Sequence, residues 1–169
     1  MVAAARDAYR ASMTPPRPIM ELAWSFHRVL HRVAGGRVST APPSASGGVG
    51  TLFLASTGRK TGKVRRTGLF YIEDGAAFVV VASNAGANAD PAWWLNLQAN
   101  PDAVVELGPR EIPVRARQAT DVEADLLWPR LEAAYGEYAR YRAQRTDPIP
   151  VVLLEQRPLL PGLPEAESD

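Results

Sequence analysis

Residues 51–82 read TLFLASTGRKTGKVRRTGLFYIEDGAAFVVVA, and this stretch decides the fold. It holds three apolar runs, 51–56, 67–72 and 78–82, each bounded by turn-type residues. The Asp74-Gly75 pair between the second and third runs is typical of a β-hairpin turn. The third run is nearly continuous in valine, which predicts a strand buried on both faces. Hairpin connections of this kind favour a mostly antiparallel sheet over a doubly wound one.

Three more strands are predicted downstream of this stretch. Runs 103–107 and 112–116 form a second hairpin around Gly108-Pro109, and 151–154 is a last apolar strand. A sheet of about six antiparallel strands removes its exposed edges by closing on itself. We therefore predict an α+β fold built on a small, mostly antiparallel β-barrel.

Two helical segments are expected to interrupt these strands. Asp90 followed by Pro91 is a typical helix start, with Asp90 as the capping residue. A capping box from Thr120 to Glu123 starts the other helix. We expect this helix to kink or restart at Pro129 and to continue to residue 141.

The remaining segments frame a single domain. Apolar residues recur at helical spacing over 18–34, which predicts an N-terminal amphipathic helix. We expect a flexible N-terminus over 1–17, one domain over 18–157, and a flexible acidic tail over 158–169.

Composition excludes several classes of site. The chain has no cysteine, so disulfides, thiolate metal sites and thiol catalysis are excluded, and a reducing cytoplasm fits. No stretch approaches the roughly 20 apolar residues of a membrane span, and the first residues do not form a secretory signal. His27 and His31 are one helical turn apart, but no neighbouring acid completes a metal site, so none is predicted.

The strongest charge signal is the segment 58–66, GRKTGKVRR, between the first two apolar runs. It carries five of the chain's 19 Lys and Arg residues and no acid, and without it the net charge of +1 would become −4. Because close cations repel one another, an anionic ligand such as a phosphate or several carboxylates explains this cluster best. A solvated rim is the alternative. The glycine spacing does not fit a nucleotide P-loop, and no interleaved aromatic residues favour nucleic acid.

Two further features hold candidate chemistry. Tyr135, Tyr138 and Tyr141 recur every third residue, which places three phenols along one side of a helix. A phenol with a pKa of about 10 stays protonated and can donate a hydrogen bond or a proton to a reacting oxygen. Ser83 and Asn84 directly follow the valine-rich strand, where a flat ligand can approach the backbone. A packed aromatic face and a plain turn are the simpler alternatives.

Six motifs, in this order, resemble one known family, the deazaflavin-dependent nitroreductases of actinobacteria. They are TGRKTGKVRR (57–66), VVASNAG (80–86), DPAWWLNLQANP (90–101), WPRL (128–131), YGEYARY (135–141) and TDPIPVVLLE (146–155). The resemblance covers residues 50–157 and the leading helix. It implies a split β-barrel of the kind found in flavin-binding pyridoxamine-oxidase-like proteins. It also implies coenzyme F420, a 5-deazaflavin whose oligoglutamate tail carries a phosphate diester and several carboxylates.

Carried over position by position, the resemblance implies a cofactor site made of four stretches. The basic loop binds the tail, 65–70 follows the phosphate and ribityl chain, 81–84 lies beside the ring, and the helix start at 92–96 closes over the cofactor. This chain has Thr61, Phe70 and Asn84 where the nitroreductase has serine, tyrosine and lysine. The implied cofactor-binding residues are Arg59, Lys60, Thr61, Lys63, Arg65, Arg66, Thr67, Gly68, Leu69, Phe70, Val81, Ala82, Ser83, Asn84, Ala92, Trp93, Trp94, Leu95, Asn96 and Tyr138.

The implied activity is hydride transfer from reduced F420 to a small-molecule electron acceptor, namely a quinone, an activated enone or a nitroaromatic. Tyr138 and Ser83 are the implied catalytic residues, because they can hydrogen-bond the oxygen on which negative charge develops. Tyr135, Tyr138 and Tyr141 are the implied substrate wall.

Three alternatives stay open at this level. An FMN-dependent oxidoreductase on the same barrel would need fewer cations, because FMN carries a single phosphate. A non-catalytic deazaflavin carrier would bind the cofactor without turnover. The helix over 18–34 would also suit peripheral contact with the inner face of the cell membrane. The sequence does not give the oligomeric state or the physiological acceptor.

Overall fold

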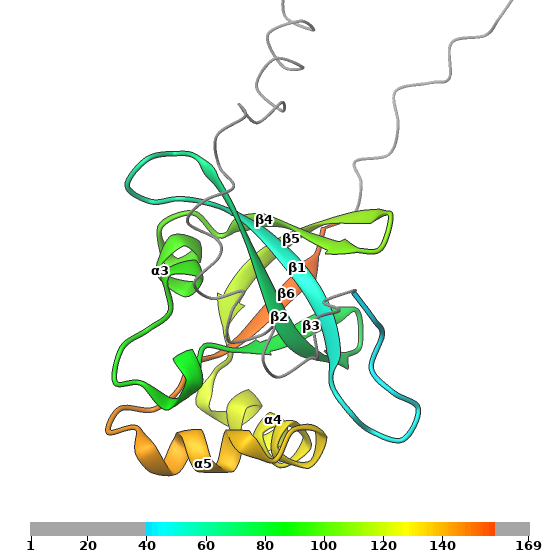
Figure 1. The fold of residues 1–169 in the computed structure, drawn as a ribbon, viewed down its shortest axis with the longest axis vertical. Helices are drawn as coiled ribbons and strands as arrows, with labels where there is room; N and C mark the ends of the chain where they lie inside the picture. Colours follow the sequence, from blue (N-terminus) through cyan, green and yellow to red (C-terminus); the bar gives the residue numbers. More distant parts are fainter. Residues whose placement is uncertain (1–39, 158–169) are drawn as a thin grey trace, which may run out of the picture.

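Six strands form a closed barrel. The computed structural model describes residues 40–157. The strands follow one another in the order β1-β2-β3-β6-β5-β4, and β1 pairs with β4 to close the barrel (Figure 1). Every neighbouring pair is antiparallel. The strands are β1 (Gly50–Thr57), β2 (Val64–Asp74), β3 (Ala77–Val81), β4 (Asp102–Leu107), β5 (Arg110–Gln118) and β6 (Val151–Gln156).

The predicted α+β fold on an antiparallel barrel of six strands is confirmed. Two hairpin turns fall where the sequence placed them. Gly75, between β2 and β3, and Gly108, between β4 and β5, have φ of +57° and +58°. Glycine adopts this left-handed conformation without a steric penalty, which is why it occupies both turns.

The loop between β1 and β2 is shorter than expected. Because β1 and β2 keep pairing up to Thr57 and Val64, the basic residues Arg65 and Arg66 belong to a strand. The loop itself is therefore 58–63, and the prediction of one basic loop over 58–66 is corrected. We call residues 58–63 the basic loop from here on.

The barrel wall separates two hydrophobic clusters. Along β3, Phe78 and Val80 pack with the interior cluster, whereas Val79 and Val81 pack with the cluster under α4 and α5. All four are 7% exposed or less, so the prediction that this strand is buried on both faces is confirmed. Alternation along the strand makes this possible, because successive side chains point to opposite faces.

Helices cover the outside of the barrel. In Figure 1, α3 lies beside the barrel next to the basic loop, and α4 and α5 lie together at another side. The helical segments are the 3₁₀ turn η1 (Asn84–Gly86), α3 (Ala92–Ala99), α4 (Asp121–Ala134) and α5 (Glu137–Gln144). The Thr120–Glu123 capping box at the start of α4 is confirmed in both of its hydrogen bonds.

Two details of the predicted helices are wrong. Asp90 does not cap α3. Pro91, with ψ of 149°, is the capping residue, and the Asp90 carboxylate binds Arg145 instead. Pro129 stays inside α4, and the chain leaves the helical conformation at Tyr135, directly before Gly136. The three tyrosines therefore do not share one helix, because Tyr135 precedes α5.

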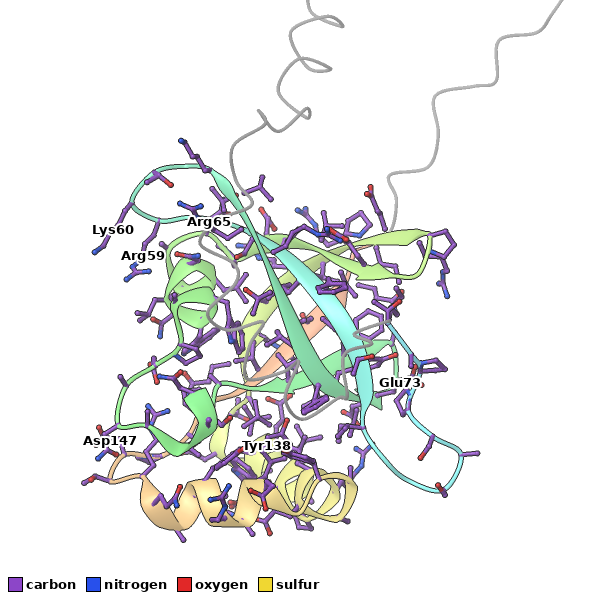
Figure 2. All side chains as sticks on the ribbon, viewed as in Figure 1. Arg59, Lys60, Arg65, Glu73, Tyr138 and Asp147 are labelled. Carbon is purple, nitrogen blue, oxygen red and sulfur yellow. The ribbon has the colours of Figure 1, made fainter. Side chains whose placement is uncertain are left out.

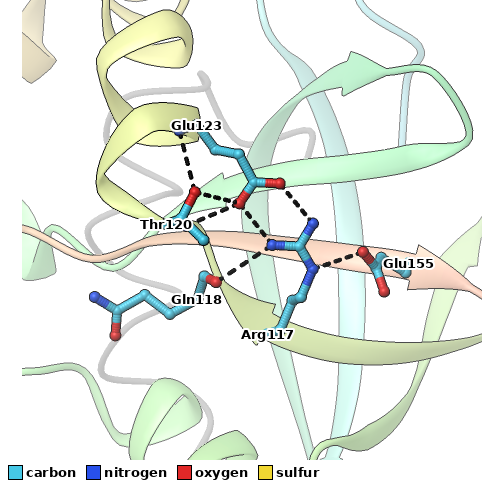
Figure 3. Close-up of polar contacts among 5 residues, drawn as sticks. All are labelled: Arg117, Gln118, Thr120, Glu123 and Glu155. Carbon is cyan, nitrogen blue, oxygen red and sulfur yellow. Dashed lines mark hydrogen bonds and ion pairs between the residues drawn. The ribbon is translucent and has the colours of Figure 1, made fainter.

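A group of hydrogen bonds and ion pairs around Arg117 fixes α4 to the barrel (Figure 3). Arg117 of β5 donates two hydrogen bonds of 2.7 Å to the carboxylate of Glu123 and one of 2.7 Å to Glu155 of β6. Glu123 also accepts hydrogen bonds from the backbone and hydroxyl of Thr120. We call Arg117, Thr120, Glu123 and Glu155 the Arg117 cluster. Its charge-assisted bonds tie two strands and a helix start together.

Several predictions fall outside residues 40–157. The amphipathic helix over 18–34, His27, His31 and the tail over 158–169 lie there, so the flexible ends and the peripheral membrane contact stay predictions. Within the described part of the chain, no helix is both long enough and apolar enough to span a bilayer.

Candidate cofactor and substrate site

The basic loop is held in one conformation by its own backbone and by α3. The amide of Gly58 donates to the carbonyl of Lys63 (2.8 Å), and the amide of Gly62 donates back to Gly58 (2.7 Å). The backbone and guanidinium of Arg59 both donate to the Oδ1 atom of Asn96 in α3, at 3.1 and 3.2 Å. Asn96 is a buried polar residue, so this contact anchors the loop to a rigid helix.

Most cations of this region have no acidic partner. Within residues 40–157, no ion pair is made by Arg59, Lys60, Lys63 or Arg65, while Arg66 pairs with Glu106 of β4. The guanidinium of Arg66 also lies 5.0 Å from the centroid of the Phe53 ring. The predicted five-cation cluster is thus four unpaired cations and one that a carboxylate already neutralises.

Strand β2 divides the predicted residues 65–70 between two faces. Leu69 packs in the interior cluster, and Arg65 alternates onto the same face, opposite Ser56. Arg66 and Phe70 point outward. At any one point along β2, a ligand would therefore meet the side chains of one set and only the backbone of the other. The Ser56 hydroxyl is buried without a hydrogen-bond partner among the described residues.

The segment after β3 has an unusual backbone. Ser83 is buried and precedes η1, where Asn84 and Ala85 adopt φ of +46° and +53°. Residues with side chains rarely adopt such values, and strained turns of this kind concentrate at functional sites. The Asn84 side chain donates to the carbonyl of Ala89 (3.1 Å), which closes the turn on itself.

An aromatic cluster lies between β2 and α5. Tyr138 contacts Tyr135 and Tyr141, with ring centroids 5.1 and 6.3 Å apart, and Tyr135 contacts Phe70 of β2 at 5.1 Å. The structure therefore joins the three predicted tyrosines to Phe70. It also brings η1 to them, because a Cβ atom at Gly86 would lie 3.3 Å from Cδ1 of Tyr141.

Burial raises the pKa values of two of these phenols, those of Tyr135 and Tyr138. Desolvation, with the neighbouring Tyr135 and Tyr141, raises the pKa of Tyr138 well above its ordinary value. Desolvation and a hydrogen bond with Tyr141 raise the pKa of Tyr135 to about 12. Tyr138 is only 4% exposed, so its phenol is a neutral hydrogen-bond donor held inside the protein.

Several predicted cofactor residues are core residues. The side chains of Leu69, Ala82, Trp93 and Trp94 belong to the interior cluster, and Val81 belongs to the cluster under α4 and α5. These positions can offer a ligand little more than backbone. The half-buried Thr67 and Leu95 and the exposed Thr61 and Ala92 keep accessible side chains.

Figure 2 shows how the two groups lie. Arg59 and Lys60 extend from the basic loop beside α3, and Tyr138 lies between the barrel and α5. The segment 82–91 and α3 connect one group to the other along the same side of the barrel (Figure 1). A long ligand with an anionic end and a flat end would match this arrangement.

Sequence reasoning missed Arg145. Its side chain is only 5% exposed, and it donates to the carbonyl of Ala82 (3.1 Å) and to the carboxylate of Asp90. The sequence signal was weak, because one arginine between α5 and the motif 146–155 looks like any surface residue. Asp90, the partner of Arg145, was interpreted as a helix cap.

Comparisons with known proteins identify the family of this chain. A family model described as F420H(2)-dependent quinone reductase matches residues 26–156. An F420H(2)-dependent quinone reductase of Mycobacterium tuberculosis (strain ATCC 25618 / H37Rv) is 37% identical over 135 residues, covering 78% of this chain and 89% of that protein.

Solved structures agree as well. One described as an F420-H2 dependent reductase is 32% identical, with a TM-score of 0.58, and covers 62% of this chain and 93% of its own. Another, described as a domain-swapped dimer, is 29% identical with a TM-score of 0.60, and covers 78% of this chain and 94% of its own. With a family match over residues 26–156 and a curated relative at this identity, the chain belongs to the F420H(2)-dependent quinone reductase family.

Proposed function

We propose that this protein transfers a hydride from reduced F420 to a quinone, with activated enones and nitroaromatics as further acceptors. Family membership supports coenzyme F420 as the cofactor and hydride transfer as the class of reaction. One observation supports the binding mode, namely the four cations that form no ion pair within residues 40–157 and lie on or beside a loop that Asn96 fixes to α3.

The donor set of the basic loop fits an anionic tail. Arg59 and Arg65 can bind phosphate or carboxylate oxygens bidentately, and Lys60 and Lys63 add point charges. The loop contains no acid that would repel such a ligand. Because its backbone is already ordered by internal hydrogen bonds, binding would need little further ordering.

The flat end of the cofactor would lie toward the Ser83 turn and the aromatic cluster. When bound, the reduced deazaflavin supplies a hydride. Around it, the chain's own residues would orient the acceptor and exclude water. Phe70, Tyr135 and Tyr141 offer an apolar aromatic wall suited to a planar quinone.

Ser83 and Tyr138 would stabilise the charge that develops on the acceptor oxygen. Both are buried, and burial makes a hydrogen bond to a developing anion stronger than it is in water. The raised pKa of Tyr138 means that the phenol carries its proton throughout the physiological range. It can therefore donate a hydrogen bond, or a proton, to the reduced oxygen.

The test is an anaerobic reaction of purified protein, reduced F420 and menadione, followed by the return of deazaflavin absorbance. We expect saturable turnover that depends on protein concentration. F420 binding without turnover of any quinone, enone or nitroarene would contradict the proposal and favour a carrier. Purification with stoichiometric FMN, and no F420 binding, would favour the flavin alternative.

The role of Tyr138 has its own test. Tyr138→Phe should lower kcat by roughly a hundredfold, the size of effect expected for one donor to a developing oxyanion, while leaving F420 affinity nearly unchanged. Tyr71→Phe is the matched control, since it removes a hydroxyl from a tyrosine of the interior cluster. Equal effects of the two substitutions would remove Tyr138 from the mechanism.

A further inference from the structure

Arg145 connects the two ends of the segment that joins β3 to α3. Its guanidinium donates to the carbonyl of Ala82, directly before Ser83, and to the carboxylate of Asp90, directly before the capping residue Pro91. A single side chain therefore brackets residues 83–90. Its Nε atom is fully buried and has no hydrogen-bond partner among the described residues.

Other contacts join the same segment to the end of α5. The amide of Thr146 donates to the Oδ1 atom of Asn88 (3.0 Å). Gly86 packs so closely that an added Cβ atom would lie 2.6 Å from Oε1 of Gln144. The segment thus rests on Gln144, Arg145 and Thr146, and Arg145 is the charged member of this contact.

The bracketed segment holds its backbone in an unfavourable conformation. Asn84 and Ala85 both have positive φ, and such residues keep these values only where the surrounding structure imposes them. The Asp90–Arg145 ion pair is well placed to do so, because the guanidinium is buried and its two partners lie at the two ends of the turn. Without the pair, the turn would be free to relax.

A second arginine provides an internal comparison. Arg130 of α4 also donates to one carboxylate, Asp74, and to one backbone carbonyl, Glu73, but these are adjacent residues at the end of β2 and not the two ends of a segment. The Arg130 side chain is 49% exposed, against 5% for Arg145. Exposed ion pairs contribute little, whereas a charge left buried and unpaired is strongly unfavourable. The two arginines bond the same kinds of group, but only Arg145 lies buried beside Ser83.

We propose that Arg145 is a positioning residue that holds the Ser83 turn and the start of α3 in their working geometry. It acts through Ser83 and α3 and does not itself contact the acceptor. This inference rests on the proposed function for its effect on turnover. Its effect on the segment 83–90 can be measured on the protein without cofactor.

The first measurement is amide hydrogen exchange of the cofactor-free protein. In Arg145→Lys and Arg145→Met, we expect faster exchange over 83–90, with exchange in the barrel strands unchanged. Arg130→Met is the matched control and should leave 83–90 protected. Because lysine keeps the charge but loses the forked geometry, the conservative variant should be affected less than Arg145→Met. Wild-type protection of 83–90 in folded Arg145→Lys and Arg145→Met would overturn the proposal.

The second measurement separates binding from turnover with F420 and menadione. We expect kcat to fall by about tenfold to a hundredfold in Arg145→Met, as for a small misplacement of a reacting group, with less than about a twofold change in F420 affinity. Arg130→Met should match the wild type. Unchanged kcat, or a loss confined to F420 affinity, would overturn the positioning role.

A double-mutant cycle shows whether Arg145 acts through Ser83. If it does, Arg145→Lys should lower kcat much less in the Ser83→Ala background than in the wild type. Additive effects would contradict this route. If the wild type itself reduced no acceptor, the proposed function would fail. The exchange measurement alone would then decide whether Arg145 holds residues 83–90 in place.

Discussion

The basic loop and the Arg117 cluster use the same kind of side chain in opposite ways. Arg117 is surrounded by Glu123 and Glu155, and these two carboxylates raise its pKa above its ordinary value. Around the basic loop, Arg59, Lys60 and Lys63 form no ion pair with any residue from 40 to 157. One group of charges is satisfied inside the fold, and the other is the group that we propose binds an anionic ligand.

This difference teaches how to separate structural cations from functional ones. Charge alone does not distinguish them, because arginines occur in both. The bonding partner distinguishes them, because a cation that is already bonded to carboxylates gains less interaction energy from an added anion. The contrast predicts that the Arg117 cluster governs stability, and that the basic loop governs affinity for an anionic ligand.

The largest expected effect is on F420 affinity. Arg59→Ala combined with Lys60→Ala removes two unpaired cations, so F420 binding should weaken by about ten- to a hundredfold. Titration of F420 at increasing ionic strength should also show a shallower salt dependence in the variant than in the wild type. The thermal midpoint should stay the same. An affinity indifferent to both changes would mean that the loop is only a solvated rim.

The next effect is on stability. Arg117→Met leaves Glu123 and Glu155 without their common partner, so the thermal midpoint should fall by several degrees. F420 affinity of the folded protein should not change. A midpoint equal to that of the wild type would show that the cluster contributes no more than an ordinary surface pair.

Arg66 offers an intermediate case. It belongs to the basic segment, but it already pairs with Glu106 and lies over the ring of Phe53. Arg66→Ala should therefore weaken F420 binding less than Arg59→Ala does, in a side-by-side titration. A larger loss of F420 affinity for Arg66→Ala would mean that the ligand displaces Glu106 from Arg66, so that an existing ion pair does not keep this arginine from binding the cofactor.

The smallest effect is a pH dependence. Arg117 and the hydrogen bonds from Thr120 lower the pKa of Glu123 to about 2 in the folded protein. Because the folded pKa lies below that of the unfolded chain, the stabilisation is present above about pH 4.5 and is lost as the pH falls toward 2. In Glu123→Gln, thermal midpoints measured between pH 5 and pH 2 should fall less steeply than in the wild type. Parallel curves would contradict the lowered pKa.

Much of the fold follows from local patterns. Alternating and continuous apolar runs predicted all six strands, and glycine turns placed the two predicted hairpins, because strand periodicity and turn chemistry act over a few residues. The Thr120–Glu123 capping box was predicted for the same reason. The basic loop between the first two strands was placed correctly, but it was predicted too long, because charged residues can continue a strand as well as end it.

The sequence and the family resemblance named the residues of the candidate site, but not how their side chains contact one another. The tyrosines and Phe70 were each named from the sequence, whereas their ring contacts depend on the break between α4 and α5. Asp90 looked like a helix cap because its local context fits one. The carboxylate went instead to Arg145, which is distant in sequence and could not be seen in a local window.

The sequence by itself therefore determined the barrel, the concentration of positive charge in 58–66, and the family to which the chain belongs. The tertiary structure alone decided which of those charges pair with an acid among residues 40–157, which strand face each side chain occupies, and how Arg145 brackets the Ser83 turn. The physical reason is range. Propensities and turn preferences act between near neighbours, whereas ion pairing, burial and ring contacts join residues that only the closed fold brings together.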